Sequence, residues 1–199
     1  PWTMGQFVWT GFDYLGEPTP YDEYWPSRSS YFGICDLAGL PKDRYYLYRS
    51  QWNKKDHTLH ILPHWNWKKG NEIPVMVYTD FPEAELFLNG RSLGKQKKQP
   101  YAIPPGTAEQ TKSLVEAKAL LRRYRLIWDA VKYEPGELRV VAYDADGRPA
   151  LEKKICTSGV PSELKLEADR TTIKAGEDDL SFITVSMHDS KGILCPDAS

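Results

Sequence analysis

The sequence predicts a mainly β fold, in which an immunoglobulin-like β-sandwich follows one β/α unit and precedes part of a second sandwich. From residue 57 onward, short runs of β-branched and aromatic residues alternate with turn residues. Before that point the pattern is that of a strand, a long loop and a helix. After a linker at residues 158–161 the alternation of apolar and polar residues resumes. We therefore expect three units, at residues 1–56, 57–158 and 159–199.

Composition excludes several classes of protein. The 199 residues carry 26 Lys and Arg against 27 Asp and Glu, which argues against a strongly basic nucleic-acid-binding protein. No apolar run approaches the roughly 20 residues that a membrane-spanning helix needs. The three cysteines, Cys35, Cys156 and Cys195, have no C-x-x-C spacing. Buried thiols are therefore favoured over a disulfide framework, with one disulfide and a free thiol as the alternative.

The first unit is rich in aromatic residues, since six of the seven tryptophans lie within residues 2–67. Residues 7–9 form a short apolar run between Gly5 and Gly11, which is typical of a buried strand in a parallel sheet. Pro41 suits the first turn of a helix that we expect to end near Trp52. Such a strand would have unpaired edges without neighbours. Alternatively, the first unit packs on the sandwich through its tryptophans. The candidates are Trp52, Trp65 and Trp67.

Five β-strands are predicted in the central unit, and the third runs into an Asn89-Gly90 turn, which is a strong hairpin signal. The predicted strands are residues 58–62, 74–79, 84–91, 137–143 and 150–156. Residues 95–132 interrupt this pattern with nine Lys or Arg against three acidic residues, and residues 111–123 have helical composition. We expect a basic, solvated insertion near residues 95–125 rather than a surface for an anionic polymer, because charge runs are usually exposed faces.

The last unit contains two predicted strands, at residues 164–168 and 182–187. Two or three strands rarely close a sandwich core by themselves. We therefore expect a second β-sandwich that is truncated, just as the first unit lacks the other strands of its sheet.

Several stretches resemble glycoside hydrolase family 2, and most closely its large β-galactosidases of Bacteroidetes. Residues 5–18 (GQFVWTGFDYLGEP), 28–34 (RSSYFGI) and 41–46 (PKDRYY) resemble the last strand and helix of the family's (β/α)8 TIM barrel. Residues 59–67 (LHILPHWNW) and 86–94 (LFLNGRSLG) resemble the sandwich that follows the barrel. The resemblance implies that residues 1–56 are the C-terminal end of the catalytic barrel, and it covers nearly the whole chain.

The resemblance also implies a reaction. Family members are retaining hydrolases that use two Glu residues on earlier barrel strands, so it implies no catalytic residue in this chain, which would be inactive alone. The parent protein would cleave terminal β-galactosides from an oligosaccharide or polysaccharide without a cofactor, in the periplasm or outside the cell. A non-catalytic carbohydrate-binding or structural sandwich at residues 57–157 is the alternative.

Four residues are candidates for contact with substrate: Trp9, Asp13, Tyr14 and Glu17. From the residues alone, Trp9 reads more readily as a core side chain, but the resemblance implies stacking on a sugar ring. Asp13 and Glu17 could accept hydrogen bonds from sugar hydroxyls. A catalytic Asp13/Glu17 pair is disfavoured, because a loop does not hold two carboxylates about 5–5.5 Å apart.

Three further patterns bear on ligands. Tyr14 could form an aromatic rim or pack its loop, together with Tyr21, Tyr24 and Trp25. A zinc site is disfavoured for His57, His60 and His64, because Pro63 interrupts any helix and a strand would not place them on one face. Glucuronide-hydrolysing relatives carry Asn-x-Lys before the glycine, whereas Ser30-Tyr31-Phe32 precede Gly33 here. The missing cation favours a neutral sugar.

Overall fold

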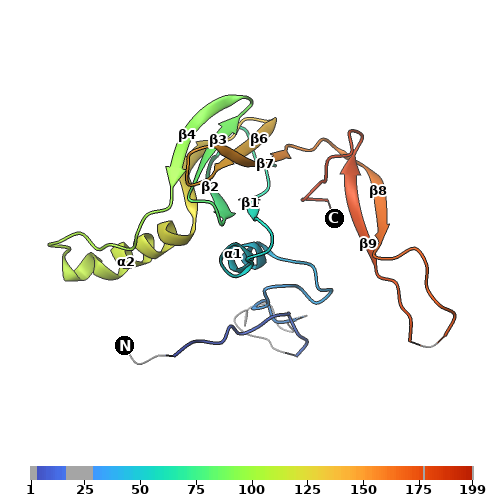
Figure 1. The fold of residues 1–199 in the computed structure, drawn as a ribbon. Helices are drawn as coiled ribbons and strands as arrows, with labels where there is room; N and C mark the ends of the chain where they lie inside the picture. Colours follow the sequence, from blue (N-terminus) through green and yellow to red (C-terminus); the bar gives the residue numbers. More distant parts are fainter. Residues whose placement is uncertain (1–3, 17–28, 177, 199) are drawn as a thin grey trace.

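The computed structural model describes residues 4–16, 29–176 and 178–198 (Figure 1). Its centre is a sandwich of two antiparallel sheets, with strand orders β1-β2-β5 and β4-β3-β6-β7. The strands are β1 (Leu59–Leu62), β2 (Glu72–Thr79), β3 (Glu83–Leu88), β4 (Arg91–Lys97), β5 (Leu126–Lys132), β6 (Glu137–Tyr143) and β7 (Pro149–Cys156). The chain changes sheet between β2 and β3, between β4 and β5, and between β5 and β6. This is an immunoglobulin-like arrangement, so the predicted mainly β fold is confirmed.

Alternating side chains of both sheets fill the sandwich. Along β3, Ala84, Leu86 and Leu88 are buried while the residues between them are partly exposed. They meet a cluster contributed by the facing sheet, whose members include Leu59, Ile61, Val75, Val77, Leu126 and Trp128. Burial of such a face requires strands in register, because a shift by one residue would turn the apolar set toward water.

The hairpin turn forms as predicted. Asn89 and Gly90 both have positive φ, of 50° and 81°, which is the backbone of the turn that joins two strands most tightly. The Asn89 side chain also accepts a hydrogen bond from the Glu137 amide and donates one to the Pro135 carbonyl oxygen. This turn therefore fixes both the β3–β4 hairpin and the entry to β6.

The basic insertion forms helix α2 (Glu109–Tyr124), which confirms the predicted helix, and Figure 1 shows it projecting from the sandwich. Leu114 and Leu120 on it are exposed. Strand β5 was missed by the sequence interpretation, which assigned residues 126–132 to the charged stretch. Leu126, Ile127 and Trp128 are nevertheless buried, and Asp129 and Ala130 after them are exposed. A short apolar run inside a charged stretch therefore forms a strand where β2 pairs with it.

The first unit is only partly as predicted. Helix α1 (Asp43–Trp52) forms, but the predicted strand at residues 7–9 does not, and Phe7 is fully exposed. A parallel strand needs a hydrogen-bonded neighbour. Among the described residues, the chain after residues 7–9 makes one isolated parallel bridge, between Phe12 and Cys35.

The alternative, in which the first unit packs on the sandwich through Trp52, Trp65 and Trp67, does not hold. Trp65 lies 1% exposed in the sandwich core, whereas Trp52 is 64% exposed. Helix α1 instead meets the sandwich through Tyr46, whose ring stacks on His60 of β1 with centroids 3.9 Å apart. Aromatic stacking of this kind depends on facing side chains, which the spacing of tryptophans along the chain does not reveal.

The last unit is an antiparallel hairpin of β8 (Pro161–Ala168) and β9 (Ile183–Asp189). In Figure 1 it lies beside the sandwich, connected by the segment after β7. Leu164, Leu166 and Val185 on it are exposed. Cys35, Cys156 and Cys195 are free thiols. The bounds of the three units stay predictions.

Candidate functional site

Trp9 and Tyr14 form a pair at the surface of the first unit. The Trp9 Nε1–H donates a hydrogen bond to the Tyr14 hydroxyl oxygen at 3.1 Å. Their rings are nearly perpendicular, at 87°, and Trp9 is 72% exposed. An indole with an apolar face and one polar edge suits the apolar face of a sugar ring. Tyr14 thus holds the edge of the indole while most of the Trp9 side chain stays accessible.

Asp13 lies beneath this pair and is buried. Its Oδ1 accepts a hydrogen bond from the Gly33 amide at 2.8 Å, and its Oδ2 lies 2.5 Å from the Lys42 ammonium. Burial raises the pKa of Asp13, but the hydrogen bonds from Lys42 and Gly33 outweigh it, so that the pKa lies below its ordinary value. Both carboxylate oxygens are therefore engaged in the protein, which favours a positioning role for Asp13.

Gly33 and Ser30 complete the support of the loop. A Cβ atom at Gly33 would collide with backbone atoms of Asp13, Cys35 and Phe12, so only glycine fits this close approach. The buried Ser30 accepts a hydrogen bond from the Tyr14 amide with its side chain and donates its own amide to the Tyr14 carbonyl oxygen. The sequence interpretation noted Ser30 and Gly33 only as a motif that lacks a cation, and it missed Lys42.

Glu17, Tyr21, Tyr24 and Trp25 lie outside the described residues. Substrate contacts of Trp9, Asp13, Tyr14 and Glu17 therefore stay predictions.

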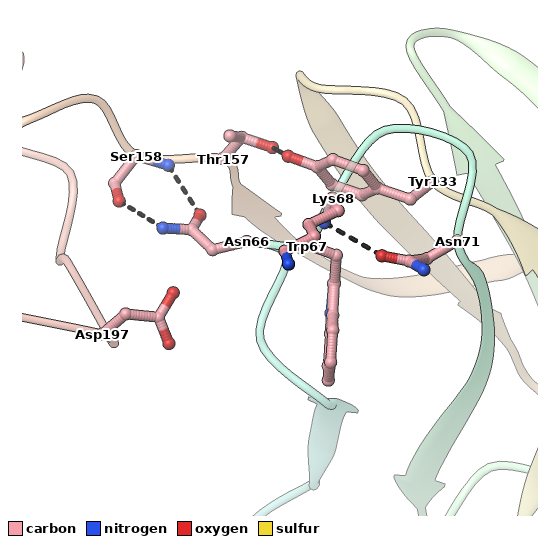
Figure 2. A pocket seen from close by; sticks show the side chains of 8 residues that line it. All are labelled: Asn66, Trp67, Lys68, Asn71, Tyr133, Thr157, Ser158 and Asp197. Carbon is pink, nitrogen blue, oxygen red and sulfur yellow. Dashed lines mark hydrogen bonds between the residues drawn. The ribbon is translucent and has the colours of Figure 1, made fainter.

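A second concave feature lies at the junction of the sandwich with the last unit (Figure 2). It is a cleft of about 490 Å³. The residues that line it are Asn66, Trp67, Lys68, Asn71, Tyr133, Thr157, Ser158 and Asp197. The sequence interpretation placed no site here, although Trp67 belongs to one of the stretches that carried the family resemblance.

The histidines have separate partners. His57 Nδ1 lies 2.6 Å from Asp80, His60 Nε2 lies 2.6 Å from Asp43, and the His64 ring stacks on another aromatic side chain. They do not converge on one point. Among residues 4–16, 29–176 and 178–198, no group of three His, Cys, Asp or Glu side chains could hold a metal ion.

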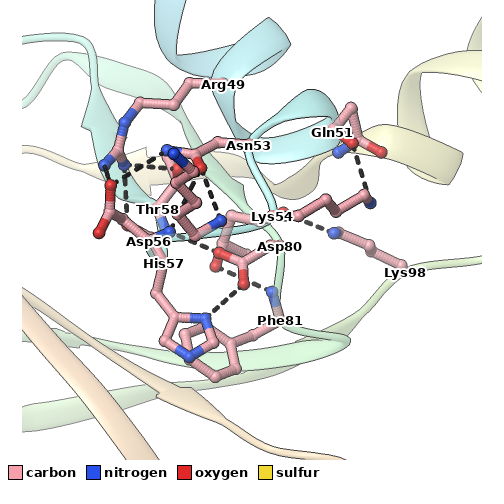
Figure 3. A network of polar contacts seen from close by, with 12 residues as sticks. Arg49, Gln51, Asn53, Lys54, Asp56, His57, Thr58, Asp80, Phe81 and Lys98 are labelled. Carbon is pink, nitrogen blue, oxygen red and sulfur yellow. Dashed lines mark hydrogen bonds and ion pairs between the residues drawn. The ribbon is translucent and has the colours of Figure 1, made fainter.

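Polar contacts around His57 join helix α1 to the sandwich (Figure 3). Arg49 of α1 donates to the His57 carbonyl oxygen at 2.8 Å and to Thr58 Oγ1 at 2.7 Å. Asp80 accepts a hydrogen bond from the Thr58 amide at 2.7 Å. Burial raises the pKa of Asp80, but the hydrogen bonds from His57 and Thr58 lower it further than burial raises it. These groups are satisfied by one another, so the network is a structural connection.

Chain-wide similarity to known proteins identifies the family. A family model described as "Domain of unknown function (DUF4982)" matches residues 70–150. "Beta-galactosidase BoGH2A" of Bacteroides ovatus is 48% identical over 195 residues, which are 98% of this chain and 20% of the relative. A "Putative beta-glucuronidase" of Formosa agariphila is 37% identical over 199 residues, covering 98% of this chain and 17% of the relative. The chain thus spans about a fifth of the length of these curated relatives.

Solved structures agree with the sequence matches. A β-glycosidase from Bacteroides vulgatus superposes with a TM-score of 0.78 at 35% identity, covering 100% of this chain and 22% of that one. A glycosyl hydrolase family 2 member from Bacteroides cellulosilyticus superposes with a TM-score of 0.73 at 30% identity, covering 97% of this chain and 26% of that one. In the part of the chain that the structure describes, no helix is both long and apolar enough to cross a membrane. Because the similarity runs through all three units and their connections, the chain belongs to glycoside hydrolase family 2.

Proposed function

We propose that this chain is a non-catalytic segment of a retaining glycosidase that hydrolyses terminal β-galactosides. The observation that carries the proposal is the 48% identity, over 98% of the chain, to a protein named a β-galactosidase. The exposed Trp9, held at its edge by Tyr14, supports it by offering a platform for one sugar ring. The substrate would be an oligosaccharide or polysaccharide with β-linked galactose, met in the periplasm or outside the cell.

A neutral sugar is favoured over a glucuronide, although several relatives are named β-glucuronidases or putative β-glucuronidases. Recognition of a sugar carboxylate needs a cation that is free to pair with it. The residues before Gly33 are Ser30, Tyr31 and Phe32, and the nearby Lys42 ammonium is engaged by Asp13. The described residues around Trp9 therefore offer hydroxyl and aromatic groups rather than an available positive charge.

Hydrolysis would require residues outside this chain. Hydrolysis with retention of the anomeric configuration needs an acid/base and a nucleophile about 5–5.5 Å apart. Asp13 is neither, because it is buried and its two oxygens already bind Gly33 and Lys42. The role that we propose for residues 1–56 is to supply Trp9 and Tyr14 to an active site whose two Glu residues come from earlier barrel strands.

The test compares two sugars and two proteins. The full-length gene product that contains this segment should hydrolyse p-nitrophenyl β-galactopyranoside much faster than the corresponding β-glucuronide, and the 199-residue chain should hydrolyse neither. Trp9→Ala in the full-length protein should lower kcat/KM for the galactoside by about tenfold or more, since an aromatic platform contributes on the order of 1 kcal/mol beyond its buried area. Preference for the glucuronide would refute the galactosidase proposal, and turnover by the 199-residue chain would refute the non-catalytic role.

A further inference from the structure

The cleft of Figure 2 has walls that the fold holds rigidly. The Asn66 side chain makes two hydrogen bonds to Ser158, accepting from its amide at 2.9 Å and donating to its hydroxyl at 2.7 Å. On the neighbouring wall, the Thr157 hydroxyl lies 3.0 Å from the Tyr133 hydroxyl and donates to the Trp65 carbonyl oxygen at 2.7 Å. These contacts join residues that are 24 to 92 positions apart in the chain. The cleft is therefore preformed.

Other polar groups on the same cleft are only partly engaged by the fold. Lys68 and Asn71 come from the turn before β2, where the Asn71 side-chain oxygen accepts a hydrogen bond from the Lys68 amide. The Lys68 ammonium and the Asn71 side-chain nitrogen make no hydrogen bond to another described residue. The Asp197 carboxylate lies 3.8 Å from His64 Nε2, which is a long ion pair. The cleft thus presents two sets of donors and one acceptor that a ligand could engage.

Trp67 adds an apolar surface to this edge. Its Nε1–H donates to the His64 carbonyl oxygen at 2.8 Å, and its ring is stacked on the His64 ring at 4.8 Å and 7°. The stack covers one face of the indole, and the side chain remains 40% exposed. An oriented indole beside hydroxyl-binding groups is the combination that suits a sugar ring, which has an apolar face and a polar rim.

We infer that this cleft binds a neutral glycosyl unit, at a site separate from Trp9. A volume of about 490 Å³ lies within the range of small-molecule sites, roughly 300–1,000 Å³. Lys68 and Asn71 would donate to sugar oxygens, Asp197 would accept from a hydroxyl, and Trp67 would contact C–H groups. An anion is a poorer fit, because the negative charge of Asp197 offsets the positive charge of Lys68. The class of sugar rests on the proposed function, whereas the presence of a site rests on the geometry of the cleft.

Binding is tested by nuclear magnetic resonance on the 199-residue chain, with β-1,4-galactotetraose as the probe. We expect saturable shifts of the Trp67 indole N–H and the Asn71 side-chain amide. Trp67→Ala and Lys68→Met should each weaken binding by about tenfold, given the strength of one aromatic or charge-assisted contact. Trp52→Ala removes an exposed tryptophan elsewhere, is the matched control and should bind as the unchanged chain does. Trp9→Ala removes the other proposed sugar contact, and the shifts at Trp67 and Asn71 should persist in it.

Three outcomes would overturn the inference, and a fourth would defeat only the proposed function. No shift at about 10 mM galactotetraose, a concentration that would reveal even millimolar affinity, would mean that there is no site. Shifts abolished by Trp9→Ala but retained in Trp67→Ala would place binding at Trp9 alone. If the chain bound tetragalacturonate but not galactotetraose, the cleft would be an anion site. Saturable galactotetraose binding at Trp67, together with a full-length protein that does not hydrolyse galactosides, would instead defeat only the proposed function.

Discussion

The Lys42 ammonium lies 2.5 Å from the Asp13 carboxylate, which joins the residue before helix α1 to the loop that carries Trp9 and Tyr14. Asp13 is nearly excluded from water while Lys42 remains partly exposed. Removal of one partner from a buried pair costs more than the pair itself contributes, because the remaining charge keeps its desolvation penalty. We therefore expect loss of either partner to disturb the loop that carries the aromatic pair.

Asp13→Ala should loosen this loop without unfolding the sandwich. The Gly33 amide loses its acceptor, and a hydrogen bond to a charged group contributes about 2 kcal/mol, so hydrogen exchange at Gly33 should accelerate about 30-fold. The Val140 amide in β6 should exchange as before. Asp56→Ala, which removes an exposed carboxylate, is the matched control. Equal exchange at Gly33 in both variants would show that Asp13 does not hold the loop.

The stabilisation that this contact provides should be lost only as the pH falls. The pKa of folded Asp13 lies below its ordinary value, about 3.9 in an unfolded chain. Its stabilisation is therefore fully present above the unfolded pKa and is lost as the pH falls through the folded pKa. The chemical shift of the Gly33 amide proton should stay constant from neutral pH to about 4 and change below that value. In Asp13→Asn this acid transition should disappear, and its persistence would assign it to another group.

Gly33→Ala should disrupt the loop more than any other glycine change in the first unit. The added Cβ atom would meet backbone atoms of Asp13, Cys35 and Phe12, which no side-chain rotation can relieve. Gly11→Ala, where the Cβ atom meets open space, is the control. We expect large amide shifts at Asp13 and Cys35 only in Gly33→Ala. Similar spectra for the two variants would contradict the close approach.

Tyr46→Ala should weaken the docking of helix α1 on the sandwich, which Arg49 and Asp43 also contact. The Tyr46 ring stacks on His60 at an interplanar angle of 7°, and loss of such a contact costs about 1 kcal/mol beyond the buried area. Amides of α1 should exchange about tenfold faster or more. Arg44→Ala on the same helix changes an exposed side chain and should leave exchange within about twofold. If both variants behave alike, another contact docks the helix.

Leu86→Ala should destabilise the sandwich by about 2–5 kcal/mol, since the side chain is 0% exposed and its loss leaves a cavity. Leu114→Ala on α2 should change the free energy of unfolding by less than about 0.5 kcal/mol, because that leucine is exposed. Urea denaturation followed by circular dichroism measures both. A large effect of Leu114→Ala would mean that the basic insertion packs on a surface.

Local sequence signals determined much of this protein. The Asn89-Gly90 turn, the alternation along β3, the helix at Asp43–Trp52 and the family resemblance could all be recognised from neighbouring residues. Each depends on interactions within a few positions, so the residues alone predict it.

Tertiary structure decided the rest. The run at residues 7–9 has strand composition but no hydrogen-bonded neighbour among the described residues, and β5 is a strand because β2 pairs with it. Asp13 meets Lys42 across 29 positions, and Asn66 meets Ser158 across 92. The physical reason is that pairing, burial and the shape of a cleft depend on partners brought together by folding, and a local pattern does not specify those partners.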